Sequence, residues 1–222
     1  MSLELNDIEI RDILKDALSK GASGTISDFS AWVLMYSRLK NKEPQQINDA
    51  LISLHLQNLK AEGFAMEGKF DPSEVQISDN NIPKNGQWNS DSYTVFGNQK
   101  YSPIQYVRSR LEFFLRYNGI DEEDVMDISI ATIEAIENTV KYGDGNNVFI
   151  ENSIDETKKF RITILNNIKE FDLQYEIERG KYSSNATLMR GVMVMQKLFN
   201  HFELEIIDDT QQAKLYAEKN LK

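Results

Sequence analysis

Glu134 and Asn138 are the two residues whose types and spacing most clearly suggest chemistry. They stand four positions apart in the segment SIATIEAIENTVKYG, which has helical apolar spacing, so both side chains lie on one helix face. An amide oxygen can ligate Mg²⁺, which takes few protein oxygens and keeps several waters. A nearby carboxylate can orient or deprotonate an attacking hydroxyl or water. Such pairs also occur on many solvated helix faces, and the spacing alone favours that plainer interpretation.

The elements expected around this pair are helices followed by strands. Asp121 can cap the helix that carries the pair, and this helix is expected to run to about Tyr142. An earlier helix is expected to begin at Ser102 and Pro103. A helix over 187–201 and strands over 93–96, 148–153, 160–165, 202–207 and 213–217 complete the set. This order favours the α+β class, as a two-layer α/β sandwich with helices on one face of a sheet.

The first part of the chain has a different pattern of residues. Apolar residues at helical spacing predict helices over 7–19, 27–39 and 44–63. From 67 to 92 the residues Pro, Gly, Asn, Asp and Ser dominate, and no periodic pattern remains. We therefore expect a small, mainly helical N-terminal domain over 1–66, a linker over 67–92 and a second domain over 93–222.

Composition limits the classes of partner and site. The chain has 222 residues and no cysteine, which excludes disulfides and thiolate metal sites. Its formal net charge of −10 disfavours nucleic acid and anionic membranes as partners. The sequence shows neither the positive start and apolar run of a signal peptide nor an apolar stretch that could span a membrane. A soluble, cytoplasmic protein is expected.

Two segments resemble motifs of a known family. EAIENTVKYG, residues 134–143, resembles the N-box of the GHKL or histidine-kinase-like ATPases. It looks most like the bacterial anti-sigma-factor serine kinases, whose box reads E-A-x-x-N-x-x-x-H-G or H-A. MRGVMVM, residues 189–195, resembles the second glycine box, G-x-G-x-x-x-M, which opens the helix after the ATP lid. The order of elements is also similar, so the resemblance covers residues 93–222.

The resemblance implies ATP and Mg²⁺ as ligands and assigns roles to particular residues. Glu134 matches the general base, and Asn138 matches the Mg²⁺ ligand. Gly191 matches the remaining glycine of the second box, where backbone amides at a helix start meet phosphate. Residues from about 171 to 190 match the lid. Arg190 or Lys181 can reach a phosphate from that segment, although the family motif assigns neither of them.

Several positions depart from the family pattern. The first glycine box reads D-x-G-x-G, and its Asp accepts a hydrogen bond from the adenine amino group. Here Asn166 stands at the Asp position, while Ile168 and Glu170 stand at the glycine positions. An amide oxygen still accepts from adenine, though more weakly than a carboxylate does, and a β-branched side chain lacks the freedom of glycine. Met189 replaces a glycine of the second box, and Tyr142 replaces the histidine after the N-box.

The resemblance thus implies a regulatory protein of the anti-sigma-factor kinase type. It would bind a protein partner, a sigma factor or an anti-sigma antagonist, under control of ATP and Mg²⁺, with serine-kinase activity left open and homodimers common in the family. The alternative is a non-enzymatic pseudo-ATPase interaction module that no longer binds nucleotide. A third interpretation is a helix-turn-helix or winged unit that reads DNA through Gln45, Gln46 and Asn48, and the scarcity of basic residues disfavours it.

Overall fold

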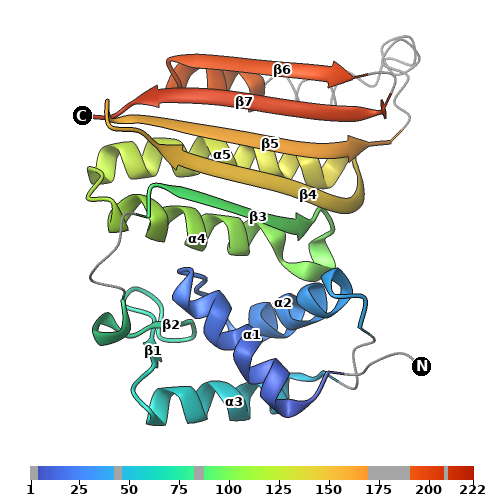
Figure 1. Ribbon diagram of the computed structural model, residues 1–222, viewed down its shortest axis with the longest axis vertical. Coiled ribbons are helices and arrows are strands. Elements are labelled where there is room, and N and C mark those ends of the chain that lie inside the picture. The colour runs from blue at the N-terminus through green and yellow to red at the C-terminus, as the bar shows by residue number, and fades with distance from the viewer. Residues whose placement is uncertain (1–4, 43–46, 83–87, 170–190, 208–209) are drawn as a thin grey trace. The chain divides into compact units, whose positions relative to one another are not determined.

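The computed structural model describes residues 5–42, 47–82, 88–169, 191–207 and 210–222. These residues divide into two compact units (Figure 1). Unit 1 takes in Met1–Gln87 and Gln99–Phe114, and unit 2 takes in Trp88–Asn98 and Leu115–Lys222.

Unit 1 begins with three helices, α1 (Asp7–Ser19), α2 (Ile26–Leu39) and α3 (Asp49–Ala61). Capping boxes begin the first two, at Asn6 with Glu9 and at Thr25 with Asp28, which explains why these boundaries are readable from local sequence. Trp32 is fully buried in this unit, with its ring edge-to-face against Phe29 at 4.7 Å between centroids. The expected first two helices are therefore confirmed.

A hairpin follows the three helices. Strands β1 (Ala65–Glu67) and β2 (Val75–Ile77) pair antiparallel, and Gly24 forms a bridge to Val75. The 3₁₀ turn η1 (Asp79–Asn81) comes next. Unit 1 thus contains three helices followed by a two-stranded antiparallel hairpin. Part of the polar stretch 67–92, which was expected to be a linker, thus forms strand β2 and the turn η1.

The expected start of the third helix at residue 44 is wrong. Helix α3 begins at Asp49, because the Asn48 side chain caps it by accepting a hydrogen bond from the Leu51 backbone N–H at 3.0 Å. Gln45 and Gln46 lie outside the described residues. Asn48, the third residue considered for reading DNA, therefore has a role in the local fold, and DNA binding stays the disfavoured interpretation.

Helix α4 (Pro103–Tyr117), preceded by the 3₁₀ turn η2 (Gln99–Tyr101), contributes most of its length to unit 1. Its first turns are joined to α2 by hydrogen bonds. Trp32 Nε1 donates to the Ser102 carbonyl at 3.2 Å, and the hydroxyls of Tyr36 and Tyr106 are 2.7 Å apart. The segment 99–114 was expected to belong to the second domain, over 93–222. In the structure it belongs to unit 1, with the N-terminal helices.

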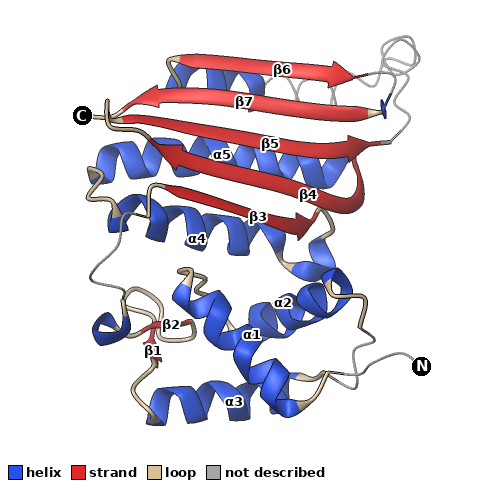
Figure 2. Cartoon of the chain, in the orientation of Figure 1, coloured by secondary structure: helices blue, strands red, loops and turns tan. Residues whose placement is uncertain are grey.

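Unit 2 is built on a five-stranded antiparallel sheet in the order β3-β4-β5-β7-β6. The strands are β3 (Ser90–Phe96), β4 (Gly143–Ile154), β5 (Lys159–Ile168), β6 (His201–Ile207) and β7 (Gln212–Asn220). Helix α5 (Glu122–Tyr142) and a helix over residues 191–198 lie on one face of this sheet (Figures 1 and 2). The α+β class, with helices on one face of a sheet and a helical N-terminal part, is confirmed.

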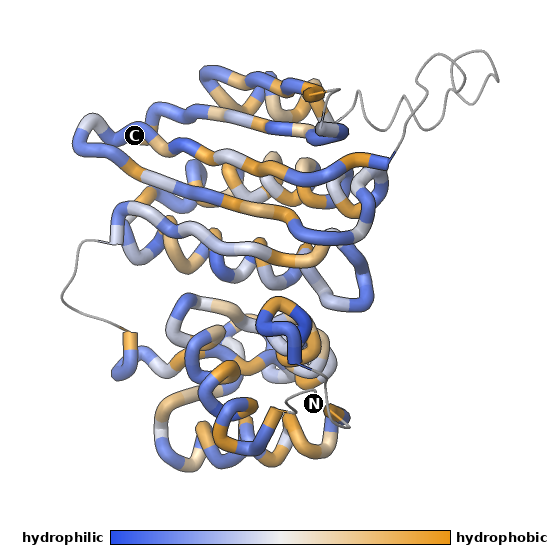
Figure 3. The backbone as a smooth tube through the Cα atoms, turned by 45° about the vertical axis from the view of Figure 1, so that its right-hand side comes forward, coloured by the Kyte–Doolittle hydropathy of each residue, from blue (hydrophilic) through white to orange (hydrophobic). Residues whose placement is uncertain are grey.

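The strand register sorts side chains onto two faces. From Lys159 to Ile164 of β5, polar and hydrophobic residues alternate (Figure 3), and Phe160, Ile162 and Ile164 are buried on the helix side. The helix expected over 187–201 ends earlier, at residue 198, because His201 opens β6 and the Asn200 backbone N–H donates to the Glu218 carbonyl at 2.9 Å. Among the helices described, none is long and apolar enough to cross a membrane.

The outer face of the sheet carries an ion-pair cluster around Glu218. Its carboxylate accepts hydrogen bonds from the Tyr216 hydroxyl at 2.5 Å, Lys159 Nζ at 3.0 Å and Arg161 Nε at 3.1 Å. The Tyr216 hydroxyl first, then Lys159 and Arg161, lower the pKa of Glu218 to about 2. A carboxyl whose pKa is lowered by folding adds stability above its unfolded pKa, and that stability is lost as the pH falls through the folded pKa.

We therefore expect Glu218→Gln to reduce stability at neutral pH and to flatten the acid dependence of unfolding between about pH 4.5 and pH 2. Urea unfolding across this pH range measures the effect, and Glu156→Gln, at an exposed turn, is the control. Identical pH dependence in the Glu218 variant and in the wild type would show that this cluster does not stabilise the fold.

Candidate functional site

Helix α5 places Glu134 and Asn138 on its flank. Asp121 caps the helix by accepting from the Glu123 backbone N–H at 2.9 Å, as the sequence predicted. Residues of the buried stripe, including Ala135 and Ile136, face inward. Glu134 and Asn138 sit beside this stripe and are partly exposed, so both remain accessible to a ligand.

Gly191, the first described residue of the helix over 191–198, lies directly against this pair. A Cβ built on Gly191 would be 2.5 Å from Asn138 Nδ2 and 3.7 Å from Glu134 Oε2. Only glycine fits there without displacing the amide. The structure therefore brings Glu134, Asn138 and Gly191 together. Arg190, Lys181 and the expected lid over 171–190 lie outside the described residues.

Asn166 lies inside a strand, not after one. Strand β5 was expected to end at Leu165, but it continues to Ile168 because β4 and β7 pair with it through Val148 and Ala213, which stand opposite Asn166. Asn166 is buried, and its Nδ2 donates to the Asn167 carbonyl at 2.9 Å. One of the two N–H groups of the Asn166 amide is used in this way, and its amide oxygen is a hydrogen-bond acceptor.

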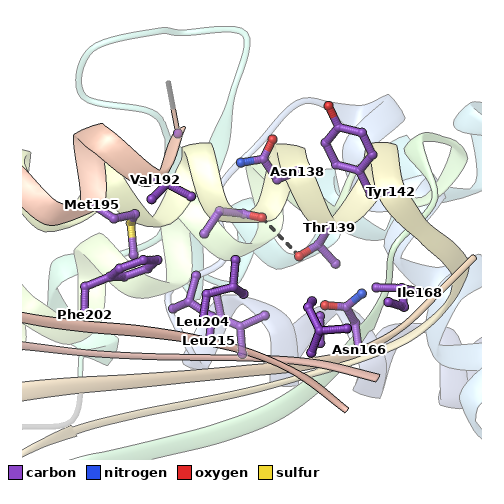
Figure 4. A pocket seen from close by; sticks show the side chains of 15 residues that line it. Asn138, Thr139, Tyr142, Asn166, Ile168, Val192, Met195, Phe202, Leu204 and Leu215 are labelled. Carbon is purple, nitrogen blue, oxygen red and sulfur yellow. Dashed lines mark hydrogen bonds between the residues drawn. The ribbon is translucent and has the colours of Figure 1, made fainter. Parts of the chain in front are cut away.

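These elements enclose a cavity of about 130 Å³. Its walls come from β5, β6, β7, the helix over 191–198 and the C-terminal half of α5 (Figure 4). Most of the lining is apolar, with side chains such as Leu215, Met195 and Phe202. Asn138 and Asn166 both border it, at different places in the wall. A cavity with apolar walls and a few fixed polar groups suits a planar ring that carries a hydrogen-bond donor.

Two further positions that depart from the motifs the sequence resembles border the cavity. Ile168, which stands where the motif has a glycine, lines it with a branched side chain, and Tyr142, which stands where the motif has a histidine, lines it with an aromatic ring. The Tyr142 carbonyl accepts from the Lys169 backbone N–H at 3.2 Å. The Lys141 ammonium lies 5.0 Å from the centroid of the Tyr142 ring. Glu170 and Met189 lie outside the described residues.

The sequence interpretation missed Thr139 and Gly143. Thr139 is buried, borders the cavity and donates its hydroxyl to the Ala135 carbonyl at 3.0 Å. Its position directly after Asn138 in the sequence could have indicated that Thr139 belongs to the site. Gly143 joins α5 to β4, and other atoms pack closely around its Cα. A Cβ there would be 2.4 Å from the Thr139 carbonyl oxygen and 3.2 Å from Asn166 Nδ2.

Gly143→Ala is therefore expected to destabilise unit 2 by about 1–3 kcal/mol, because a backbone carbonyl cannot move aside cheaply. Urea unfolding gives the value. Gly97→Ala is the matched control, since its new Cβ would meet the movable Val148 methyl group at 3.1 Å. If Gly143→Ala costs no more than Gly97→Ala, then the junction tolerates a side chain and Gly143 does not fix the position of Asn166.

No protein-family model and no curated protein matches the chain. Among solved structures, one similar chain is described as the crystal structure of the RsbU and RsbW domains of Rv1364c from Mycobacterium tuberculosis. It is 14% identical with a TM-score of 0.46, and the match covers 67% of this chain and 35% of that one, about a third of its length. A likeness this distant assigns neither a function nor any site residue.

Proposed function

We propose that the chain is a regulatory protein of the anti-sigma-factor kinase type, which binds a protein partner under the control of ATP and Mg²⁺. One observation carries this proposal, namely the meeting of Glu134, Asn138 and Gly191 beside a largely apolar cavity. The partner would be a sigma factor or an anti-sigma antagonist, and homodimerisation stays a prediction.

The residues present fit a nucleotide with Mg²⁺. The Asn166 oxygen would accept a hydrogen bond from the adenine amino group, and the apolar walls would hold the ring. Asn138 would supply an amide oxygen to Mg²⁺, since its Nδ2 side faces Gly191 and its oxygen is the other end of the amide. The Gly191 backbone N–H would meet phosphate, and Arg190 is proposed as a further phosphate contact. Bound Mg²⁺ would neutralise phosphate charge.

Glu134 is proposed as the general base. Its carboxylate lies beside Asn138 and Gly191, the two groups assigned to metal and phosphate. There it would take the proton of an attacking serine hydroxyl on an antagonist protein, while the serine oxygen bonds to the γ-phosphorus and ADP leaves. The activity would be that of an ATP-dependent serine-protein kinase.

A second function is favoured by one observation. Ile168 lines the cavity where the family has a glycine that lets the backbone approach the ligand. A side chain at this place reduces the room for a nucleotide. The second candidate is therefore a pseudo-ATPase, which keeps the fold as a non-enzymatic interaction module and no longer binds nucleotide.

Calorimetric titration with ATP and Mg²⁺ separates the two candidates. Binding to the wild type that Asn166→Leu weakens at least roughly tenfold supports the nucleotide site, because a hydrogen bond matched to the ligand is lost. Asn152→Leu is the matched control, since Asn152 is a fully buried amide on the same face of the sheet that does not line the cavity. Equal ATP affinity in the Asn166→Leu and Asn152→Leu variants would show that Asn166 does not contact the nucleotide.

A further inference from the structure

Lys219 places a buried ammonium group where three segments of unit 2 meet. Its Nζ lies 2.9 Å from Asp127 Oδ2 and 3.5 Å from Asp124 Oδ1, both on the first turns of α5. The same nitrogen donates to the Leu198 carbonyl at 3.2 Å. Asp124 is 1% exposed and Lys219 is 9% exposed, so the contacts lie within the fold.

The Leu198 carbonyl belongs to the last turn of the helix over 191–198. Carbonyls at a helix C-terminus lack partners within the helix and carry partial negative charge, so a cation is favourable there. The acidic side chains of Asp124 and Asp127 lie near the N-terminus of α5, and negative charge is favoured at a helix N-terminus. Lys219 therefore joins the C-terminus of one helix to the N-terminus of the other.

The helix over 191–198 is thus held on α5 at two places. Its first described residue, Gly191, lies against Asn138, late in α5, and its last turn is joined through Lys219 to Asp127, early in α5. Asp127 and Asn138 are eleven residues, about 16 Å, apart along α5. Most helical stability in proteins comes from tertiary packing, so contacts of this kind fix where the helix lies. Sliding it along α5 would separate Gly191 from Asn138.

We propose that Lys219 is a positioning residue for the nucleotide site. By joining Leu198 to Asp127 it sets the position of helix 191–198 along α5, and so holds Gly191 against Asn138. The proposal rests on the function proposed above for what the site binds, but its structural part concerns this chain alone. Asn166, on β5, is outside this linkage. Lys219 should therefore govern the phosphate and metal end of the site and leave the end that holds the base unchanged.

The first test needs no nucleotide. Amide NMR spectra of isotopically labelled Lys219→Met protein should show shifted signals for the Gly191 backbone and the Asn138 side chain. Lys222→Met is the matched control, because the Lys222 ammonium pairs with Glu123, also on the first turn of α5, at 2.5 Å and has no described contact with helix 191–198. Changes confined to the neighbourhood of Lys219 itself, with Gly191 and Asn138 unmoved, would overturn the proposal.

Removal of the ammonium leaves Asp124 buried without its partner, so Lys219→Met can fail to fold. In that case the double variant Lys219→Met with Asp124→Asn carries the test, since it leaves no buried unpaired charge at that position. Lys219→Arg should restore the wild-type signals of Gly191 and Asn138, because a guanidinium can make the same contacts. A Lys219→Arg protein that resembles the methionine variant would contradict the role assigned to the charge.

The second test separates the two ends of the site. Lys219→Met should weaken ATP with Mg²⁺ by about tenfold, as outer partners of a metal site do, and leave adenosine affinity within about twofold. Equal losses for both ligands would mark a general structural effect and overturn the positioning role. If the wild type binds neither ligand, the proposed function fails, and the NMR comparison still decides whether Lys219 positions the helix.

Discussion

Glu134→Ala is expected to lower the rate of phosphate release from ATP by roughly 10²–10⁴-fold while ATP affinity stays near that of the wild type. The reason is that the carboxylate serves only to take a proton from the attacking oxygen, whereas the contacts assigned to the nucleotide come from other residues. Water replaces the serine hydroxyl as acceptor in this assay, so no partner protein has to be known.

Glu137→Ala is the control for this result, because Glu137 is an exposed carboxylate on the same helix that does not line the cavity. Phosphate release is followed with ATP and Mg²⁺ in excess, and affinity is measured separately by titration. Equal rates for the wild type and Glu134→Ala, with measurable turnover, would show that Glu134 is not the base. Loss of both rate and affinity would place Glu134 in nucleotide binding instead.

Asn138→Ala is expected to remove the part of the ATP affinity that depends on Mg²⁺. The amide oxygen is the only protein ligand assigned to the metal, so the variant should bind ATP equally with Mg²⁺ and with a chelator. The wild type at about 100 times its dissociation constant should gain ~2.7 kcal/mol, or about 5–10 °C in melting temperature, and the variant should lose most of this gain.

Asn138→Asp provides the matching conservative change, since a carboxylate oxygen can also ligate Mg²⁺. It should keep a Mg²⁺-dependent shift that Asn138→Ala loses. The variants also need equal stability without ligand, because Asn138 Nδ2 packs against Gly191. A Mg²⁺-dependent stabilisation of the same size in Asn138→Ala would remove Asn138 from the metal site.

The parts of the fold that follow from local sequence were predictable. Helix α5 was expected from the Asp121 cap to Tyr142, and the structure confirms those limits. Capping residues and apolar periodicity act within a few residues of each other, so the signal is complete in the sequence. The pairing of Glu134 with Asn138 on one face follows from the same helical spacing.

Features that depend on contacts between residues far apart in the sequence were harder to predict. Asn166 and Asn167 look like the end of a strand, because amide residues are common in turns, yet both stay in the ladder opposite Ala213 and Gln212. The short strand β2 was likewise hidden in a polar stretch, since its pairing with β1 is not visible in local composition. The tight packing at Gly143 depends on a carbonyl one turn earlier and on an amide from another strand.

The melting temperature of the wild-type protein with millimolar ATP and Mg²⁺, compared with Mg²⁺ alone, tests the central claim most directly. The claim is that the cavity between α5, the helix over 191–198 and the sheet holds a nucleotide. An increase of several degrees that saturates with ATP concentration, as mass action requires for a ligand that binds only the folded state, is the predicted result. An unchanged melting temperature at every ATP concentration would contradict the claim and favour the pseudo-ATPase function.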